Sequence, residues 1–115
     1  MLKINLADER RFKAKVTVQT PQESGGKREC SFTAHFRVLT YSEQEEILER
    51  NPGGADFQIL KTALVGWGDD LQDEEGQPIP FTDDTLRAIL DIPYIRMAMY
   101  RAFIAGNTGT GRTKN

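Results

Sequence analysis

TDDTLRAILDIPYIRMAMYRAFIAG, residues 82–106, is the stretch around which the rest of the chain is expected to pack. Proline lacks an amide hydrogen and its ring clashes with the preceding turn, so Pro93 predicts that one helix ends near Asp91 and that a second helix follows. The second helix has one apolar stripe at helical spacing, formed by Ile92, Ile95, Met99, Ala102 and Phe103. A second apolar side is formed by Met97, Tyr100 and Ile104. Because a chain of 115 residues has a limited core, we expect another chain to cover one of the two sides.

Two runs in the first third of the chain alternate apolar and polar residues with the period of a β-strand. The apolar face of the first run consists of Phe12, Ala14, Val16 and Val18. The apolar face of the second consists of Cys30, Phe32, Ala34, Phe36 and Val38. The turn-forming TPQESGGK lies between the runs and predicts an antiparallel hairpin. A shorter alternation of Leu2, Ile4 and Leu6 predicts a third strand at an edge of the sheet.

Three further helix signals follow the hairpin. Ser42 and Glu45 have the spacing of a capping box, which predicts a short helix that buries Ile47 and Leu48. A second amphipathic helix is predicted from the apolar spacing of Phe57, Leu60, Leu64 and Trp67. Thr82 is the expected N-cap of the first C-terminal helix, whose apolar residues are Leu86, Ile89 and Leu90.

The sequence therefore predicts an α+β fold in which an N-terminal antiparallel hairpin packs against about four helices. We expect one domain over residues 1–106 and a disordered polar tail over residues 107–115. The predicted core residues are Phe32, Phe36, Phe57, Leu60, Leu64, Trp67, Ile95, Met99 and Phe103.

Composition limits the classes of function. Fifteen basic and seventeen acidic residues give a net charge of −2, which provides no general attraction to nucleic acid or to an anionic membrane. The single cysteine cannot form an internal disulfide, which favours a reducing compartment. No apolar run approaches the length of a signal peptide core or a membrane span. We therefore expect a cytoplasmic protein with no membrane partner.

The sequence argues against a metal site and against a catalytic site. Cys30 and His35 are five residues apart on an alternating strand, so they emerge on opposite faces and cannot share a metal ion. We expect Cys30 to be buried and His35 to lie on the solvated face of the sheet. No catalytic motif is present, and we expect neither enzymatic activity nor a cofactor.

The acidic stretch at residues 69–84 has seven carboxylates and neither lysine nor arginine. Its glycine and prolines predict an exposed loop or small hairpin. If Gly76 is taken as the sixth residue of a calcium loop, Leu71 falls at the first position and Thr82 at the twelfth, where the loop needs acidic ligands. The calcium interpretation therefore fails at both anchors.

A nucleic-acid surface is also disfavoured. Lys13, Lys15 and Arg37 could make the outer face of the hairpin basic, but this face lacks aromatic stacking residues and carries Glu29.

Several segments in the second half of the chain resemble a known family. These segments are ALVGW at residues 63–67, DEEGQPIPFT at 73–82, LRAIL at 86–90, DIPYIR at 91–96, Ala98, and YRAF at 100–103. They are similar to the tail assembly chaperones of long-tailed, lambda-like siphoviruses and prophages. Members of that family are small non-virion proteins that bind the long, hydrophobic, helical tape measure protein. They keep it soluble until the tail tube polymerises around it.

The resemblance implies the tape measure protein as partner, the major tail protein as a further partner, self-association, and the host bacterial cytoplasm as location. We expect the contacts on the second apolar side of the C-terminal helix, at Met97, Tyr100 and Ile104, together with Tyr94 and Arg101. The rival interpretation is that the monomer's own core covers this side. Two other functions remain open: a tail-completion or connector protein that stays in the particle, and a small nucleic-acid-binding regulator.

Overall fold

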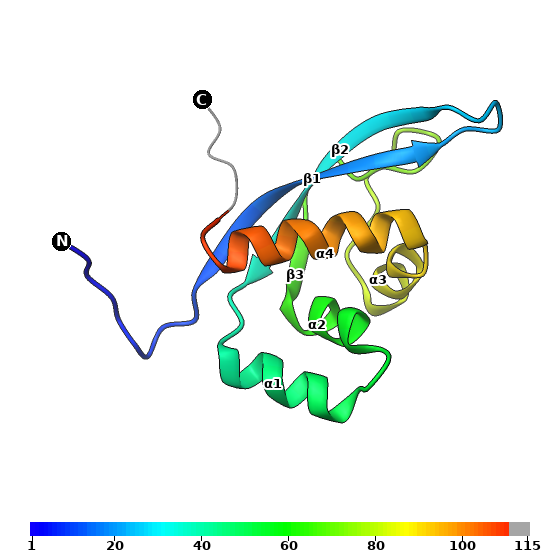
Figure 1. Cartoon of the computed structure of the whole chain (residues 1–115). Helices are drawn as coiled ribbons and strands as arrows, with labels where there is room; N and C mark the ends of the chain where they lie inside the picture. Colours follow the sequence, from blue (N-terminus) through cyan, green and yellow to red (C-terminus); the bar gives the residue numbers. More distant parts are fainter. Residues whose placement is uncertain (111–115) are drawn as a thin grey trace.

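The two alternating runs form the predicted antiparallel hairpin. In the computed structural model, which describes residues 1–110, β1 (Arg11–Pro21) pairs with β2 (Lys27–Arg37) over their whole length, and Phe12 lies opposite Phe36. Apolar side chains of both strands point to one face, where Phe36 is fully buried. Figure 1 shows that the tip of the hairpin extends beyond the helices. The far end of the hairpin is therefore solvated on both faces.

The third strand, β3 (Leu64–Trp67), lies where the sequence predicted the end of a helix. The preceding helix stops at Ala63, and β3 pairs with β2 to complete a sheet with the order β1-β2-β3. A bulge in this pairing places Leu64 opposite Phe36 and Trp67 opposite Ala34, so both ends of β3 reach the apolar face. The same three-residue spacing also fits a helical stripe, which is why the sequence pattern was misleading.

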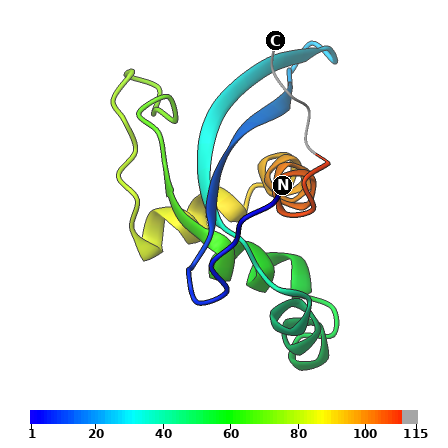
Figure 2. The same cartoon turned by 90° about the vertical axis from the view of Figure 1, so that its left-hand side faces the viewer.

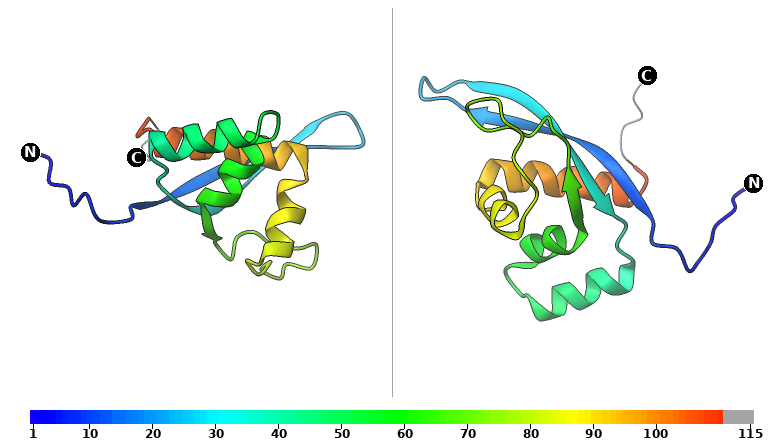
Figure 3. Two further views of the ribbon diagram at one scale, coloured as in Figure 1. Left: turned by 90° about the horizontal axis from the view of Figure 1, so that it is seen from below. Right: turned by 180° about the vertical axis from the view of Figure 1, so that it is seen from behind.

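The third strand predicted at Leu2, Ile4 and Leu6 is wrong. Residues 1–10 form no strand and are all exposed. Both panels of Figure 3 show this segment running away from the body of the molecule at the start of β1. The alternation is present, but no strand within residues 1–110 lies beside it.

The four helices are α1 (Tyr41–Arg50), α2 (Ala55–Ala63), α3 (Asp83–Leu90) and α4 (Pro93–Asn107). As predicted, α3 ends just before Pro93, which occupies the first position of α4. Thr82 caps α3, with Thr85 as its reciprocal partner. Figure 2 shows α4 on one side of the hairpin and the loop between β3 and α3 on the other.

The predicted start of α1 is wrong by two residues. Thr40 is the N-cap, and its hydroxyl and the Glu43 carboxylate form the capping box instead of Ser42 and Glu45. Both pairs have the same spacing, but Glu43 also contacts Arg37 at the end of β2, with an Nη1–Oε2 distance of 3.0 Å. Leu48 is exposed and Ile47 only half-buried, so the predicted burial of both residues is also wrong.

The core contains most of the residues predicted for it. Phe32, Phe36, Leu60, Leu64, Trp67, Met99 and Phe103 are buried, whereas Phe57 and Ile95 are half-buried at its margin. The predicted boundary at residue 106 is one residue too early. Asn107 is the last residue of α4, and its side chain bonds the backbone N–H of Leu39 at 2.8 Å and the Leu39 carbonyl at 3.1 Å. Of the tail predicted at 107–115, residues 111–115 lie outside the described part of the chain.

Candidate functional site

The exposed side of α4 carries three of the five predicted contact residues. Met97 is 57% exposed, Tyr94 is 39% exposed, and Arg101 is also exposed. These residues are three and four positions apart, so they follow one another along the same side of the helix. The Arg101 Nη2 group lies 3.3 Å from the Met97 sulfur, which brings their side chains together. We call these three residues the α4 stripe.

Tyr100 and Ile104, the other two predicted contact residues, are half-buried and pack against the core. The predicted second apolar side therefore divides into an exposed part and a part that the monomer covers. The rival interpretation, burial by the monomer's own core, holds in part for these two residues. Tyr100 also faces a pocket beside the α4 stripe.

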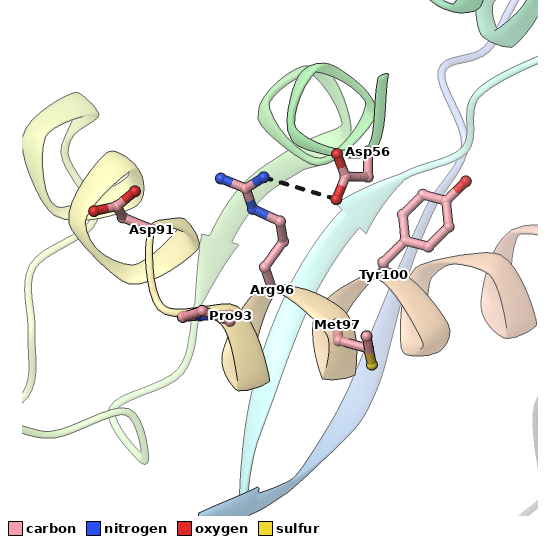
Figure 4. A pocket seen from close by; sticks show the side chains of 6 residues that line it. All are labelled: Asp56, Asp91, Pro93, Arg96, Met97 and Tyr100. Carbon is pink, nitrogen blue, oxygen red and sulfur yellow. Dashed lines mark ion pairs between the residues drawn. The ribbon is translucent and has the colours of Figure 1, made fainter. Parts of the chain in front are cut away.

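This pocket, of about 510 Å³, lies between α2 and the first half of α4. It is lined by Asp56, Asp91, Pro93, Arg96, Met97 and Tyr100 (Figure 4). Met97 and Tyr100 supply apolar surface, while Asp56 and Asp91 place carboxylates at the rim. The pocket therefore suits an apolar side chain that has a polar or basic neighbour.

Arg96 is held in place on the wall of this pocket. Its Nε–H donates to the Leu90 carbonyl at 2.7 Å, and its Nη1 lies 3.7 Å from a carboxylate oxygen of Asp56. The guanidinium also lies 5.3 Å from the centre of the Phe57 ring, within the range of a cation–π contact. Arg96 thus links the end of α3, α4 and α2.

Sequence reasoning missed this pocket because one of its walls is formed by α2. Asp91 directly precedes α4 in the chain, but Asp56 of α2 becomes a neighbour of α4 only in the folded protein. The one signal in the sequence was Arg96, which with Arg101 is one of the two strongly polar side chains early in an otherwise apolar helix.

The acidic stretch is a loop whose seven carboxylates are exposed, as predicted, although Leu71 within it is buried in the core. Gln72 and Pro78 form an isolated bridge, and the Asp73 carboxylate accepts from the backbone N–H groups of Glu75 and Gln77 at 2.9 and 3.0 Å. Gly76 has a φ of +80°, a conformation that favours glycine. Backbone donors within the turn therefore already bond the Asp73 carboxylate.

Asp70, at the start of this stretch, bonds to β2 through its side chain, next to the end of β3. Its carboxylate accepts from the Thr33 backbone N–H at 3.1 Å and from the Thr33 hydroxyl at 2.9 Å. These hydrogen bonds, with a smaller contribution from the charge of His35, lower the pKa of Asp70 below its ordinary value of 3.8.

We expect Asp70→Ala to remove a pH-dependent contribution to stability. A carboxylate with a lowered folded-state pKa stabilises the fold above its ordinary pKa, and this stabilisation is lost as the pH falls through the folded value. The melting temperature of the wild type should therefore exceed that of Asp70→Ala at pH 6, and the difference should disappear as the pH falls through the folded-state pKa of Asp70. Asp69→Ala is the control, and an equal effect in both variants would contradict the assignment to Asp70.

Cys30 is exposed, so its predicted burial is wrong. It points to the apolar face of β2, but it lies in the part of the hairpin beyond the helices, where residues 27–31 are all exposed. His35 is half-buried, at a position paired with Gly66 of β3. Within residues 1–110, no group of three or more His, Cys, Asp or Glu side chains could hold a metal ion.

The basic outer face of the hairpin is small. Lys13 and Lys15 are exposed on β1, but the Arg37 guanidinium bonds the Glu43 carboxylate. The Thr40 backbone N–H and this guanidinium lower the pKa of Glu43, so the carboxylate remains charged beside Arg37. Charge pairing thus reduces the positive field that a nucleic acid would meet.

None of the helices in the described part of the chain combines the length and apolarity needed to cross a membrane. A comparison of the chain with protein-family models, curated proteins and solved structures finds no match.

Proposed function

We propose that this protein is a tail assembly chaperone of a long-tailed bacteriophage or prophage. In this role it binds the hydrophobic, helical tape measure protein in the host cytoplasm and keeps it soluble until the tail tube polymerises around it. It acts by binding alone, without catalysis or a cofactor. The similarity of the segments between residues 63 and 103 to that family supports the proposal.

The structural observation that carries the proposal is the α4 stripe beside an open pocket. A helix packs on another helix through side chains three and four positions apart, which is the spacing of Tyr94, Met97 and Arg101. Methionine adapts its shape to different apolar partners, and tyrosine combines an apolar ring with a polar end. Such a surface suits a partner that presents many similar apolar helical segments.

The pocket adds a place for one side chain of the bound helix. Met97 belongs to both the α4 stripe and the pocket wall, so an apolar partner residue could enter the pocket while its helix lies along the stripe. Asp56 already lies beside Arg96, so Asp91 is the carboxylate at the rim that favours a lysine or arginine beside that residue. The preference is for a class of helix and does not require one exact sequence.

The test is co-purification with the tape measure protein encoded beside this chain. We expect the double variant Tyr94→Ala, Met97→Ala to reduce binding by about tenfold or more, because both side chains are exposed and available to a partner. Its melting temperature should change little, since exposed side chains contribute little to folding. Tyr100→Ala should lower both binding and stability, because Tyr100 also packs against the core.

Leu48→Ala is the matched control, since Leu48 is 53% exposed on α1 and Met97 is 57% exposed on α4. Loss of binding in Leu48→Ala equal to that in the double variant would contradict a specific role for α4. Recovery of the protein in purified phage particles would instead favour the structural tail component. Salt-sensitive retention on DNA would favour the nucleic-acid-binding regulator.

A further inference from the structure

Residues 1–6, which we call the amino-terminal arm, have the pattern of a β-strand but pair with no strand of the described residues, 1–110. Leu2 is 85% exposed, Ile4 is 57% exposed and Leu6 is 86% exposed. Three apolar side chains at period two would share one face of a strand. Their exposure on a folded domain marks the arm as a segment that lacks a partner.

The sheet has a free edge along β1, where backbone groups are available to pair with another strand. The Val38 N–H donates to the Arg10 carbonyl at 2.8 Å, and the Gln22 N–H donates to the Gly26 carbonyl at 2.9 Å. Both Arg10 and Gln22 are even-numbered, so the even-numbered residues of β1 direct their backbone groups to β2. The residues that direct their backbone groups to the free edge are Arg11, Lys13, Lys15, Thr17 and Gln19. In the described part of the chain, no hydrogen bond uses the backbone N–H of any of these five residues.

The apolar flank of this edge is also incompletely covered. Phe12 and Ala14 point to the core face, yet both remain half-buried, whereas Val16 on the same face is fully buried. A strand added beside β1 would place its own apolar side chains next to Phe12 and Ala14. The alternating leucines and isoleucine of the arm are suited to that position.

We propose that the amino-terminal arm of one copy adds as a β-strand to the free edge of β1 in a second copy. A two-fold axis makes the exchange reciprocal, so that both arms and both edges are paired in one dimer. The arm suits this edge better than an unrelated strand does because its alternating Leu2, Ile4 and Leu6 are exposed. They match the half-buried Phe12 and Ala14 beside the edge. The proposal does not depend on the function proposed above.

The local structure directs the arm away from its own β1. The Asp8 N–H donates to the Asn5 carbonyl at 3.2 Å, and the Ala7 N–H donates to the Asn5 side chain at 3.0 Å. This turn sends residues 1–4 away from the hairpin, as Figures 1 and 3 show. The arm is thus available to another chain, while the edge of its own β1 remains free.

The test is the mass of the protein in solution, measured by size-exclusion chromatography with light scattering over a range of concentrations. We expect the wild type to reach about twice its monomer mass of 13.0 kDa. Lys15→Pro removes one N–H from the free edge without removing a bond to β2, so it should raise the dimer dissociation constant by about tenfold or more. Lys15→Ala, which keeps that N–H, is the matched control and should dimerise like the wild type.

A second variant tests the arm itself. The triple variant Leu2→Asp, Ile4→Asp, Leu6→Asp should raise the dissociation constant by about a hundredfold or more, because it removes the apolar face of the added strand. The fold should persist, since these three side chains are exposed and lie outside the core. Hydrogen exchange should show protected arm amides in the wild-type dimer and unprotected ones in Lys15→Pro.

Three results would overturn the proposal. The first is a wild type that stays monomeric at the highest concentration reached. The second is a dimer that neither Lys15→Pro nor the arm variant weakens. The third is a monomer with protected arm amides, which would show that the arm pairs with its own β1.

Discussion

Trp67→Ala is expected to lower the free energy of unfolding by about 3–5 kcal/mol. Trp67 is 8% exposed, and its ring meets Phe81 edge-on with 4.8 Å between ring centres. Its Nε1–H donates to the Ile79 carbonyl at 2.7 Å. Truncation would leave a cavity under β3 and leave that carbonyl without its partner. It would also release the loop that leads from β3 to α3.

Trp67→Phe separates the contribution of ring packing from that of the hydrogen bond to Ile79. Phenylalanine keeps most of the packing but cannot donate to Ile79, so this variant should cost about 1–3 kcal/mol. Both variants should be unfolded in urea and followed by circular dichroism, because Trp67 is the sole tryptophan. Tryptophan emission of the native wild type should be shifted to shorter wavelength than that of indole in water. Equal costs for the two variants would assign the stability to the hydrogen bond and contradict a packing role.

Local patterns predicted the parts of the fold that depend on neighbouring residues. The alternation in β1 and β2 gave the hairpin and the face that is buried. Pro93 gave the position at which α3 ends and α4 begins, because a proline without an N–H limits the backbone wherever it occurs. Thr82 gave the start of α3 for a similarly local reason, since its hydroxyl bonds a donor three residues away.

The wrong predictions concern residues whose secondary structure or burial depends on segments distant in the sequence. Leu64 and Trp67 fit a helical stripe, but the free edge of β2 and a bulge place them on a strand. Cys30 is on the apolar face, but the helices do not extend far enough to cover it. Periodicity identifies a face but does not show whether another element reaches it.

The sequence predicted the candidate site in part, as it did the fold. The helical wheel identified α4 as apolar on two sides, and Tyr94, Met97 and Arg101 are exposed there. It could not show that Tyr100 and Ile104 pack against the core, because that depends on how α4 is rotated on the sheet. Nor could it bring Asp56 of α2 next to Arg96 of α4. These contacts depend on tertiary packing.

Phe103→Ala is expected to lower the free energy of unfolding by about 3–5 kcal/mol, because it removes the side chain that fixes α4 to the hairpin. Phe103 is fully buried. Its ring centre lies 5.3 Å from that of Phe36 and 6.2 Å from that of Phe12. Helix and strand approach so closely here that a Cβ atom on Gly106 would overlap the Phe12 ring.

Met97→Ala, in the same helix, provides the comparison. Met97 is 57% exposed, so its truncation should change the free energy of unfolding by about 0.5 kcal/mol or less. Urea unfolding of both variants, followed by circular dichroism, measures the difference. A cost of several kcal/mol for Met97→Ala would show that the α4 stripe belongs to the monomer's core and not to a contact surface. A small cost for Phe103→Ala would mean that the three aromatic rings do not hold α4 on the sheet. The two variants together therefore test which side of α4 supports the fold and which side is free to bind.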